Sequence, residues 1–157
     1  MTAWRKPNIM PEENVIERAR EDEREGKLPS TQAGEFVREE MEHIREGKHG
    51  ARSPEQAIAI GLSKARRAGV KLPPPKRGRK RIQGRAKRDL AKGRRAAKGR
   101  PSQTRARAIE RALGREGRAA ATPRSLSRHA KKVARRRGAT ARSRSAEKAA
   151  RTRKKRR

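Results

Sequence analysis

The strongest constraint on the fold is a pair of apolar repeats with helical spacing between residues 30 and 72. In the first repeat the apolar positions are Ala33, Phe36, Val37, Met41 and Ile44. In the second they are Ala57, Ile58, Ile60, Gly61, Leu62 and Ala65. This spacing places apolar side chains on one face of each helix. We therefore expect two helices that pack against each other as an antiparallel hairpin.

Residues with strong preferences for helix ends flank both repeats. Ser30 precedes the first repeat and is predicted to cap its N-terminus with its hydroxyl group. Gly47 follows that repeat and is predicted to end the helix in the left-handed conformation. Ser53, a proline at the next position and Gln56 form a capping box for the second helix, and Gly69 ends it.

Gly61 lies within the apolar stripe of the second repeat. A glycine inside a helix costs about 1 kcal/mol relative to alanine. Because glycine has no side chain, it also lets another backbone come close. We expect the partner helix to approach closely at this position.

The segments on either side of the hairpin differ from it in composition. Residues 1–29 are expected to form a flexible start and a charged helix rich in acidic and basic pairs. Three prolines at 73–75 favour polyproline II geometry and are predicted to act as a stiff spacer. Residues 76–157 contain mostly Arg, Lys, Ala, Gly, Ser and Thr. The expected fold is all-α: a short helical hairpin (30–72) with a preceding charged helix, followed by a long disordered or transiently helical basic tail.

Two sequence runs within residues 31–74, GEFVREEMEHIREGKHGARS and QAIAIGLSKARRAGVKLPP, carry a family resemblance. Here the chain resembles a bacterial family of small basic proteins with a domain of unknown function. Some members of that family are labelled histone-like or plasmid-stabilisation proteins. The resemblance implies a bacterial origin and a connection with DNA, and it implies no catalytic residues.

The net charge of +31 is distributed unevenly along the chain. Residues 1–72 hold 14 basic and 13 acidic residues, whereas residues 73–157 hold 34 basic and 4 acidic residues. This asymmetry indicates a polyanionic partner. Arginine binds phosphate oxygens through its planar guanidinium group, and neutralised phosphates release counterions, which gives affinity without base recognition.

The basic residues predicted to contact nucleic acid form four clusters. They are Lys64, Arg66, Arg67 and Lys71; Lys76, Arg77, Arg79, Lys80 and Arg81; Arg135, Arg136 and Arg137; and Arg153, Lys154, Lys155, Arg156 and Arg157. The first cluster has an alternative explanation, because cations at the C-terminal end of a helix interact favourably with its dipole.

Other site chemistries have little support in the sequence. There is no cysteine. The spacing of His43, His49 and His129 is not typical of metal ligands, and the carboxylates are distributed as helix-surface ion pairs. We therefore expect no enzyme activity, no metal and no cofactor. No apolar run has the roughly 20 residues of a membrane-spanning helix or resembles a signal-peptide core, so the protein is expected to stay in the compartment where it is made. Together with the family resemblance, this gives a cytoplasmic location at the bacterial nucleoid as the expectation.

The function predicted from these features is DNA binding without sequence specificity, as in nucleoid-associated or histone-like proteins. Aromatic residues make up 1% of the chain, which disfavours single-strand recognition by base stacking. One alternative is an RNA- or ribosome-associated basic protein. Another is a plasmid-maintenance adaptor whose helical head binds a protein partner. The head is also expected to support homodimerisation if it binds no other protein.

Overall fold

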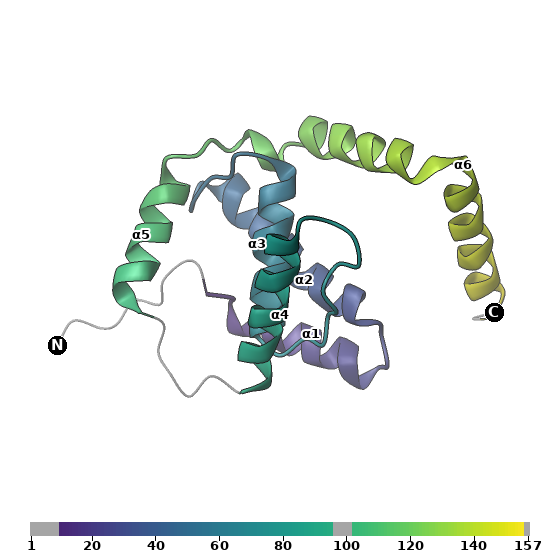
Figure 1. Cartoon of the computed structure of the whole chain (residues 1–157), viewed down its shortest axis with the longest axis horizontal. Coiled ribbons are helices and arrows are strands. Elements are labelled where there is room, and N and C mark those ends of the chain that lie inside the picture. Colours follow the sequence, from purple (N-terminus) through teal and green to yellow (C-terminus); the bar gives the residue numbers. More distant parts are fainter. Residues whose placement is uncertain (1–9, 96–101, 156–157) are drawn as a thin grey trace. The chain divides into compact units, whose positions relative to one another are not determined.

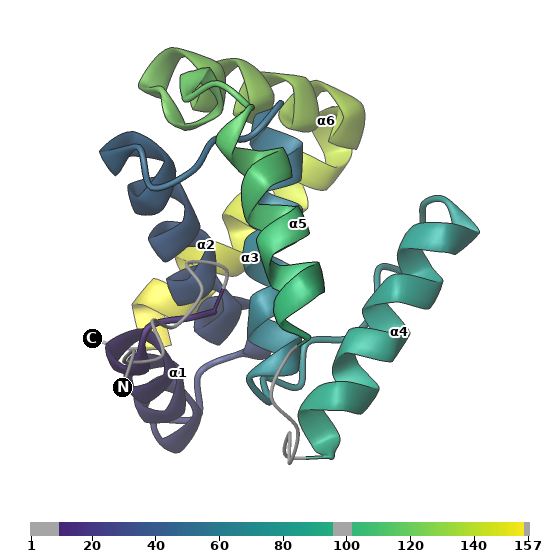
Figure 2. The ribbon, with the colours of Figure 1, turned by 90° about the vertical axis from the view of Figure 1, so that its left-hand side faces the viewer.

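The computed structural model describes residues 10–95 and 102–155, and all regular secondary structure within them is helical (Figure 1, Figure 2). The all-α prediction is therefore confirmed. The chain divides into a first unit, Met1–Ala121, and a second unit, Thr122–Arg157. None of the helices in the described residues is long and apolar enough to span a lipid bilayer.

The first unit is built around a central pair of helices. Its elements are α1 (Glu13–Arg24), α2 (Pro29–Glu46), α3 (Pro54–Arg67), α4 (Lys80–Arg94), α5 (Gln103–Gly114) and a 3-10 turn, η1 (Ala119–Ala121). Helices α2 and α3 pack against each other, α1 packs on α2, and α4 packs on α3 (Figure 1). The predicted helix pair is thus present, with a further helix on each side.

A small apolar core joins the first three helices. Its buried members are Val15 and Ala19 from α1, Ala33 and Phe36 from α2, and Ala65 and Val70 from α3 and the residues after it. Phe36 and Ile44 have no exposed surface. Three of the six buried residues in this core are larger than alanine, namely Val15, Phe36 and Val70. Small side chains and short helix–helix distances must therefore supply much of the packing.

The predicted end of α2 and the predicted cap at the start of α3 are confirmed. The backbone N–H of Gln56 donates to Ser53 Oγ over 3.2 Å. The Gln56 side chain in turn accepts a hydrogen bond from the backbone of Arg52, with a donor–acceptor distance of 2.8 Å. Gly47 ends α2 with a φ of 79°, in the left-handed region that favours glycine.

The predicted start of α2 is wrong. The helix begins at Pro29, with Leu28 in the N-cap position and no side-chain capping hydrogen bond. The fixed φ of proline suits the first turn of a helix, where its missing N–H group is not needed. The helix therefore starts before Ser30, which lies in its first turn.

The predicted close approach at Gly61 is confirmed. A Cβ atom added to Gly61 would lie 2.8 Å from the Cα atom of Val37 and 3.0 Å from the carbonyl oxygen of Phe36. Real Cβ atoms are essentially never closer than 3.0 Å to another heavy atom of this kind. The backbones of α2 and α3 can therefore pack at this distance only because residue 61 has no side chain.

The residues after the three prolines are not a disordered tail. Ser63 Oγ on α3 donates to Asp89 Oδ2 on α4 over 2.7 Å. Gly93 on α4 packs directly against the carbonyl group of Arg66, leaving no room for a Cβ atom. The Arg66 guanidinium also donates to the carbonyl oxygen of Pro73 over 3.3 Å. The chain therefore turns at the prolines and returns to α3.

The segment after α5 also belongs to the first unit. The backbone N–H of Gly50 donates to the carbonyl oxygen of Leu113 over 2.9 Å, and that of Ala51 donates to Gly117 over 3.0 Å. A Cβ atom on Gly50 would collide with the carbonyl of Glu116. These backbone hydrogen bonds attach the α2–α3 connector to the end of α5.

The second unit is a helix, α6 (Pro123–Lys155), with non-helical backbone angles at Gly138. Its start is capped by Thr122, whose Oγ1 accepts from the backbone N–H of Ser125 over 3.3 Å. The prediction of a disordered or transiently helical tail is therefore corrected. Alanine and arginine both have high helix propensity, so a segment rich in them can form a helix without contributing to a core.

Substitution of Gly61 by alanine should destabilise the first unit. The new methyl group must displace the backbone of α2, and overpacking of this kind costs roughly 1–3 kcal/mol, which outweighs the gain in helix propensity of about 1 kcal/mol. Urea denaturation followed by circular dichroism measures the change. The matched control is Gly34→Ala in α2, where a Cβ atom would meet nothing within 4 Å, so this variant should be slightly more stable than the wild type. Equal effects of the two substitutions would contradict the close approach.

Candidate functional site

Five ionisable side chains are buried where α2, α3 and their connector meet. They are Glu39, Glu40 and His43 of α2, His49 of the connector and Lys64 of α3, and each is between 0% and 6% exposed. Burying ionised groups costs free energy unless they are paired. We call these five residues the buried ionic cluster.

The cluster contains more carboxylates than ammonium groups. Lys64 Nζ lies 2.7 Å from Glu40 Oε2 and 3.8 Å from Glu39 Oε2. The other carboxylate oxygen of Glu40, Oε1, lies 3.3 Å from Nε2 of His49. With both carboxylates ionised, one negative charge among these groups is not balanced by Lys64.

The N-terminal end of α1 closes one side of the cluster. The backbone N–H of Glu12 donates to Glu39 Oε1 over 2.6 Å. The Glu12 carboxylate lies 3.2 Å from His43 Nε2 and 3.3 Å from Lys48 Nζ. Hydrogen bonds from His43 and then from Lys48 hold the pKa of Glu12 below its ordinary value of about 4.5. Glu12 is thus an ionised hydrogen-bond acceptor at neutral pH.

The structure brings together two histidines that sequence spacing does not pair. The rings of His43 and His49 meet edge to face, with their centroids 5.9 Å apart. One potential ligand atom from each of Glu40, His43 and His49 lies within 4.8 Å of the others, and the same is true of Glu12, Glu39 and His43. The one-turn spacing of residues 39, 40 and 43 is visible in the sequence. The position of His49 depends on how the connector folds back, so it could not be predicted.

Two residues predicted to contact nucleic acid, Lys64 and Arg66, are buried. Lys64 is 6% exposed and belongs to the buried ionic cluster, and Arg66 is 7% exposed. The Arg66 guanidinium donates to the carbonyl oxygens of Leu72 and Pro73. Burial lowers the pKa of Arg66 from its ordinary value, while the charge of Asp89 opposes this shift. Both cations thus make their observed contacts inside the protein, which disfavours a contact with phosphate.

Arg67 and Lys71, the other two residues of the first predicted nucleic-acid cluster, are exposed. Arg67 Nε lies 4.0 Å from Asp89 Oδ1, and Lys71 Nζ lies 2.9 Å from Glu23 Oε1. Exposed pairs of this kind are weak, typically below about 1 kcal/mol. A phosphate could therefore compete with either carboxylate.

The remaining predicted contacts lie in two places. Exposed cations in the segment leading into α4 and its first turn are Lys76, Arg77, Arg79, Lys80 and Arg81. Exposed cations on α6 are Arg135, Arg136, Arg137, Arg153, Lys154 and Lys155. Arg156 and Arg157 lie outside the described residues.

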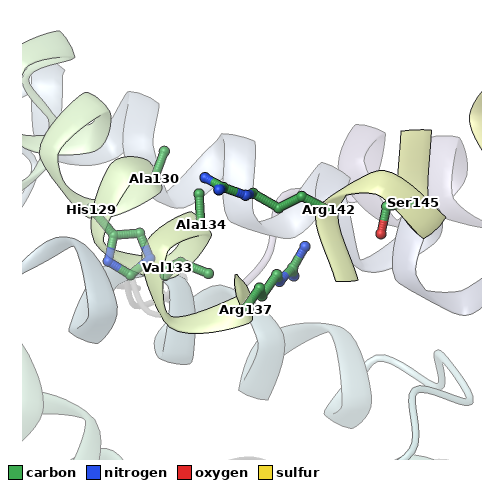
Figure 3. A pocket seen from close by; sticks show the side chains of 7 residues that line it. All are labelled: His129, Ala130, Val133, Ala134, Arg137, Arg142 and Ser145. Carbon is green, nitrogen blue, oxygen red and sulfur yellow. The ribbon is translucent and has the colours of Figure 1, made fainter. Parts of the chain in front are cut away.

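Helix α6 is the most basic element of the described chain. It contains 14 Lys and Arg residues and one Glu, a net charge of +13, and none of its residues is buried. A hollow of about 360 Å³ lies at its kink. The hollow is lined by His129, Ala130, Val133, Ala134, Arg137, Arg142 and Ser145, with Arg137 and Arg142 on opposite sides of Gly138 in the chain (Figure 3). None of these seven lining residues is acidic.

Comparison with known proteins gives one family match. Residues 29–77 match a family described as "Family of unknown function (DUF6496)". The match covers α2, α3 and the residues that lead toward α4, and it agrees with the resemblance to a family with a domain of unknown function. No curated protein and no solved structure matches the chain.

Removal of the Lys64 ammonium should strongly destabilise the first unit. Lys64→Ala leaves the carboxylates of Glu39 and Glu40 buried without a cation, which typically costs about 3–5 kcal/mol. The matched control, Arg67→Ala, removes an exposed cation from the same helix and should cost less than about 1 kcal/mol. Urea denaturation of both variants measures the difference, and similar losses would contradict the assignment of Lys64 to the interior.

The contribution of Glu12 to stability should depend on pH. Because the pKa of Glu12 is lowered in the folded chain, its stabilising effect is present above the ordinary pKa and is lost as pH falls through the lowered value. The wild type should thus be more stable than Glu12→Gln at pH 7, with the difference shrinking at pH values below 4.5. Thermal denaturation across this range, with the exposed Glu42→Gln as control, tests this. A difference that stays constant with pH would count against the ionised Glu12–His43 contact.

Proposed function

We propose that this protein binds double-stranded DNA without sequence preference, chiefly through α6. The observation that carries the proposal is that this helix has 14 basic residues and none of its residues is buried. Its cations are thus not used to stabilise a core. They lie at the surface, where a ligand that carries many negative charges can reach them.

The charge of α6 favours a regular polyanion. Like charges one turn apart on a helix repel each other, so neutralisation by phosphate would stabilise α6 as well as the complex. The 15 residues from Pro123 to Arg137 extend roughly 22 Å at about 1.5 Å per residue. A helix fits the major groove of B-form DNA, which is about 12 Å wide and bordered by phosphates.

The aromatic residues support contacts with phosphate rather than with unstacked bases. Phe36 is the only Phe, Tyr or Trp within residues 10–95 and 102–155, and it is fully buried. Proteins that bind single strands generally stack bases on exposed aromatic side chains. Duplex DNA is therefore the favoured nucleic acid.

The cellular role that follows from this proposal is DNA compaction at the bacterial nucleoid. The resemblance to a family with histone-like and plasmid-stabilisation labels supports this role. The exposed cations between residues 76 and 81 would add phosphate contacts from the first unit.

The salt dependence of binding should reveal the contribution of α6. Each phosphate contact contributes about 0.9 to the slope of log K against log salt concentration. Full-length chain carrying Arg135→Gln, Arg136→Gln and Arg137→Gln should therefore lose up to about 3 from the slope for a random-sequence duplex. Fluorescence anisotropy at several salt concentrations measures it.

The matched control removes three exposed cations from the first unit by Arg20→Gln, Arg24→Gln and Arg38→Gln. The control has the same net charge as the α6 variant, so an effect of total charge alone would change both slopes equally. That result would refute α6 as the binding element. Preferential binding to structured RNA in a competition at equal salt would refute DNA as the partner.

A further inference from the structure

We propose that Glu40, His43 and His49 form a binding site for a divalent transition-metal ion such as Zn²⁺. The three residues belong to the first unit, and none of them is among the residues proposed to bind DNA. One potential ligand atom from each residue lies within 4.8 Å of the other two. All three side chains are at least nine-tenths buried.

The hydrogen bonding of His49 leaves one nitrogen available as a ligand. Its Nδ1 lies 3.2 Å from the carbonyl oxygen of Gly50. A carbonyl oxygen can only accept, so Nδ1 must carry the proton. In the neutral ring, Nε2 then has a lone pair, and this atom lies 3.3 Å from Glu40 Oε1.

The same reasoning applies to His43. Its Nε2 lies 3.2 Å from the Glu12 carboxylate, which can only accept when ionised. Nε2 must therefore donate, and in the neutral ring Nδ1 carries the lone pair. The Nδ1 atom is buried and has no hydrogen-bond partner among the described residues.

Glu40 supplies the third ligand. Its Oε2 lies 2.7 Å from Lys64 Nζ, which leaves Oε1 for another cation. Oε1 and the His49 nitrogen would repel each other as two lone-pair carriers unless a cation lies between them. Oε1 has no hydrogen-bond partner among the described residues.

The ligand set indicates the type of metal. Two imidazoles and one carboxylate form a known zinc ligand set, with the fourth position open to water. Mg²⁺ and Ca²⁺ prefer oxygen ligands alone. The outer contacts are also those of metal sites, where ligating histidines donate their second N–H to a carboxylate or a backbone carbonyl and ligating carboxylates are themselves held by a hydrogen-bond donor. Here the partners of the two histidines are Glu12 and Gly50, and the Lys64 ammonium forms an ion pair with Glu40.

The direct test is titration of the chelator-treated full-length chain with Zn²⁺ at pH 7.5. Isothermal titration calorimetry should show one Zn²⁺ bound per chain. Long-range ¹H–¹⁵N correlation spectra of the wild type should show shifts of the His43 and His49 ring nitrogens, with those of His129 unchanged. No uptake of Zn²⁺, or shifts of His129 alone, would overturn the site.

Variants provide an independent measurement. His49→Ala should raise the dissociation constant for Zn²⁺ by about 100-fold or more, since even the loss of an outer partner lowers metal affinity by about 10–100-fold. The matched control, His129→Ala in α6, should bind Zn²⁺ as the wild type does. Circular dichroism shows whether each variant is folded, and the wild-type spectra decide the question if His49→Ala is not. Unchanged affinity in a folded His49→Ala chain would refute the proposal.

Discussion

The first unit depends on the close contact of α2 and α3 at Gly61. An added Cβ atom there would lie 2.8 Å from Val37 Cα, so the two backbones can meet only through glycine. The same pair of helices carries Glu39 and Glu40 on one side and Lys64 on the other. Their approach therefore removes these charges from water and requires them to pair. A core with few large apolar side chains is thus combined with a buried ionic cluster, which is sensitive to the loss of any one partner.

Two local helix signals and the close approach at Gly61 could be predicted from the sequence, whereas the burial of individual charged side chains could not. The cap at Ser53 and the end of α2 at Gly47 depend on a few neighbouring residues and were predicted correctly. The burial of Lys64 and Arg66 depends on which face of α3 meets the rest of the chain, and both appeared to be ordinary cations at a helix end. For the same reason, the meeting of His43 with a histidine of the connector could not be read from their spacing.

The prediction of a disordered basic tail was wrong because composition reports mainly on the capacity to bury apolar surface. Helix α6 buries none of its residues, yet its alanines and arginines favour helical backbone angles locally. Helix α4 departs from the prediction for another reason. Its Asp89 accepts a hydrogen bond from Ser63, and its Gly93 allows contact with the backbone of α3. Both are single residues whose effect depends on a partner far away in the sequence.

The backbone angles of Gly138, φ 74° and ψ 167°, lie in a region that is essentially restricted to glycine. A straight helix can follow the surface of a bent DNA duplex only over a short distance. The break at residue 138 divides α6 into two helical arms of similar length, and each arm has its own direction. If α6 binds DNA as proposed, the change of direction at this glycine would let the two arms contact separate stretches of phosphates.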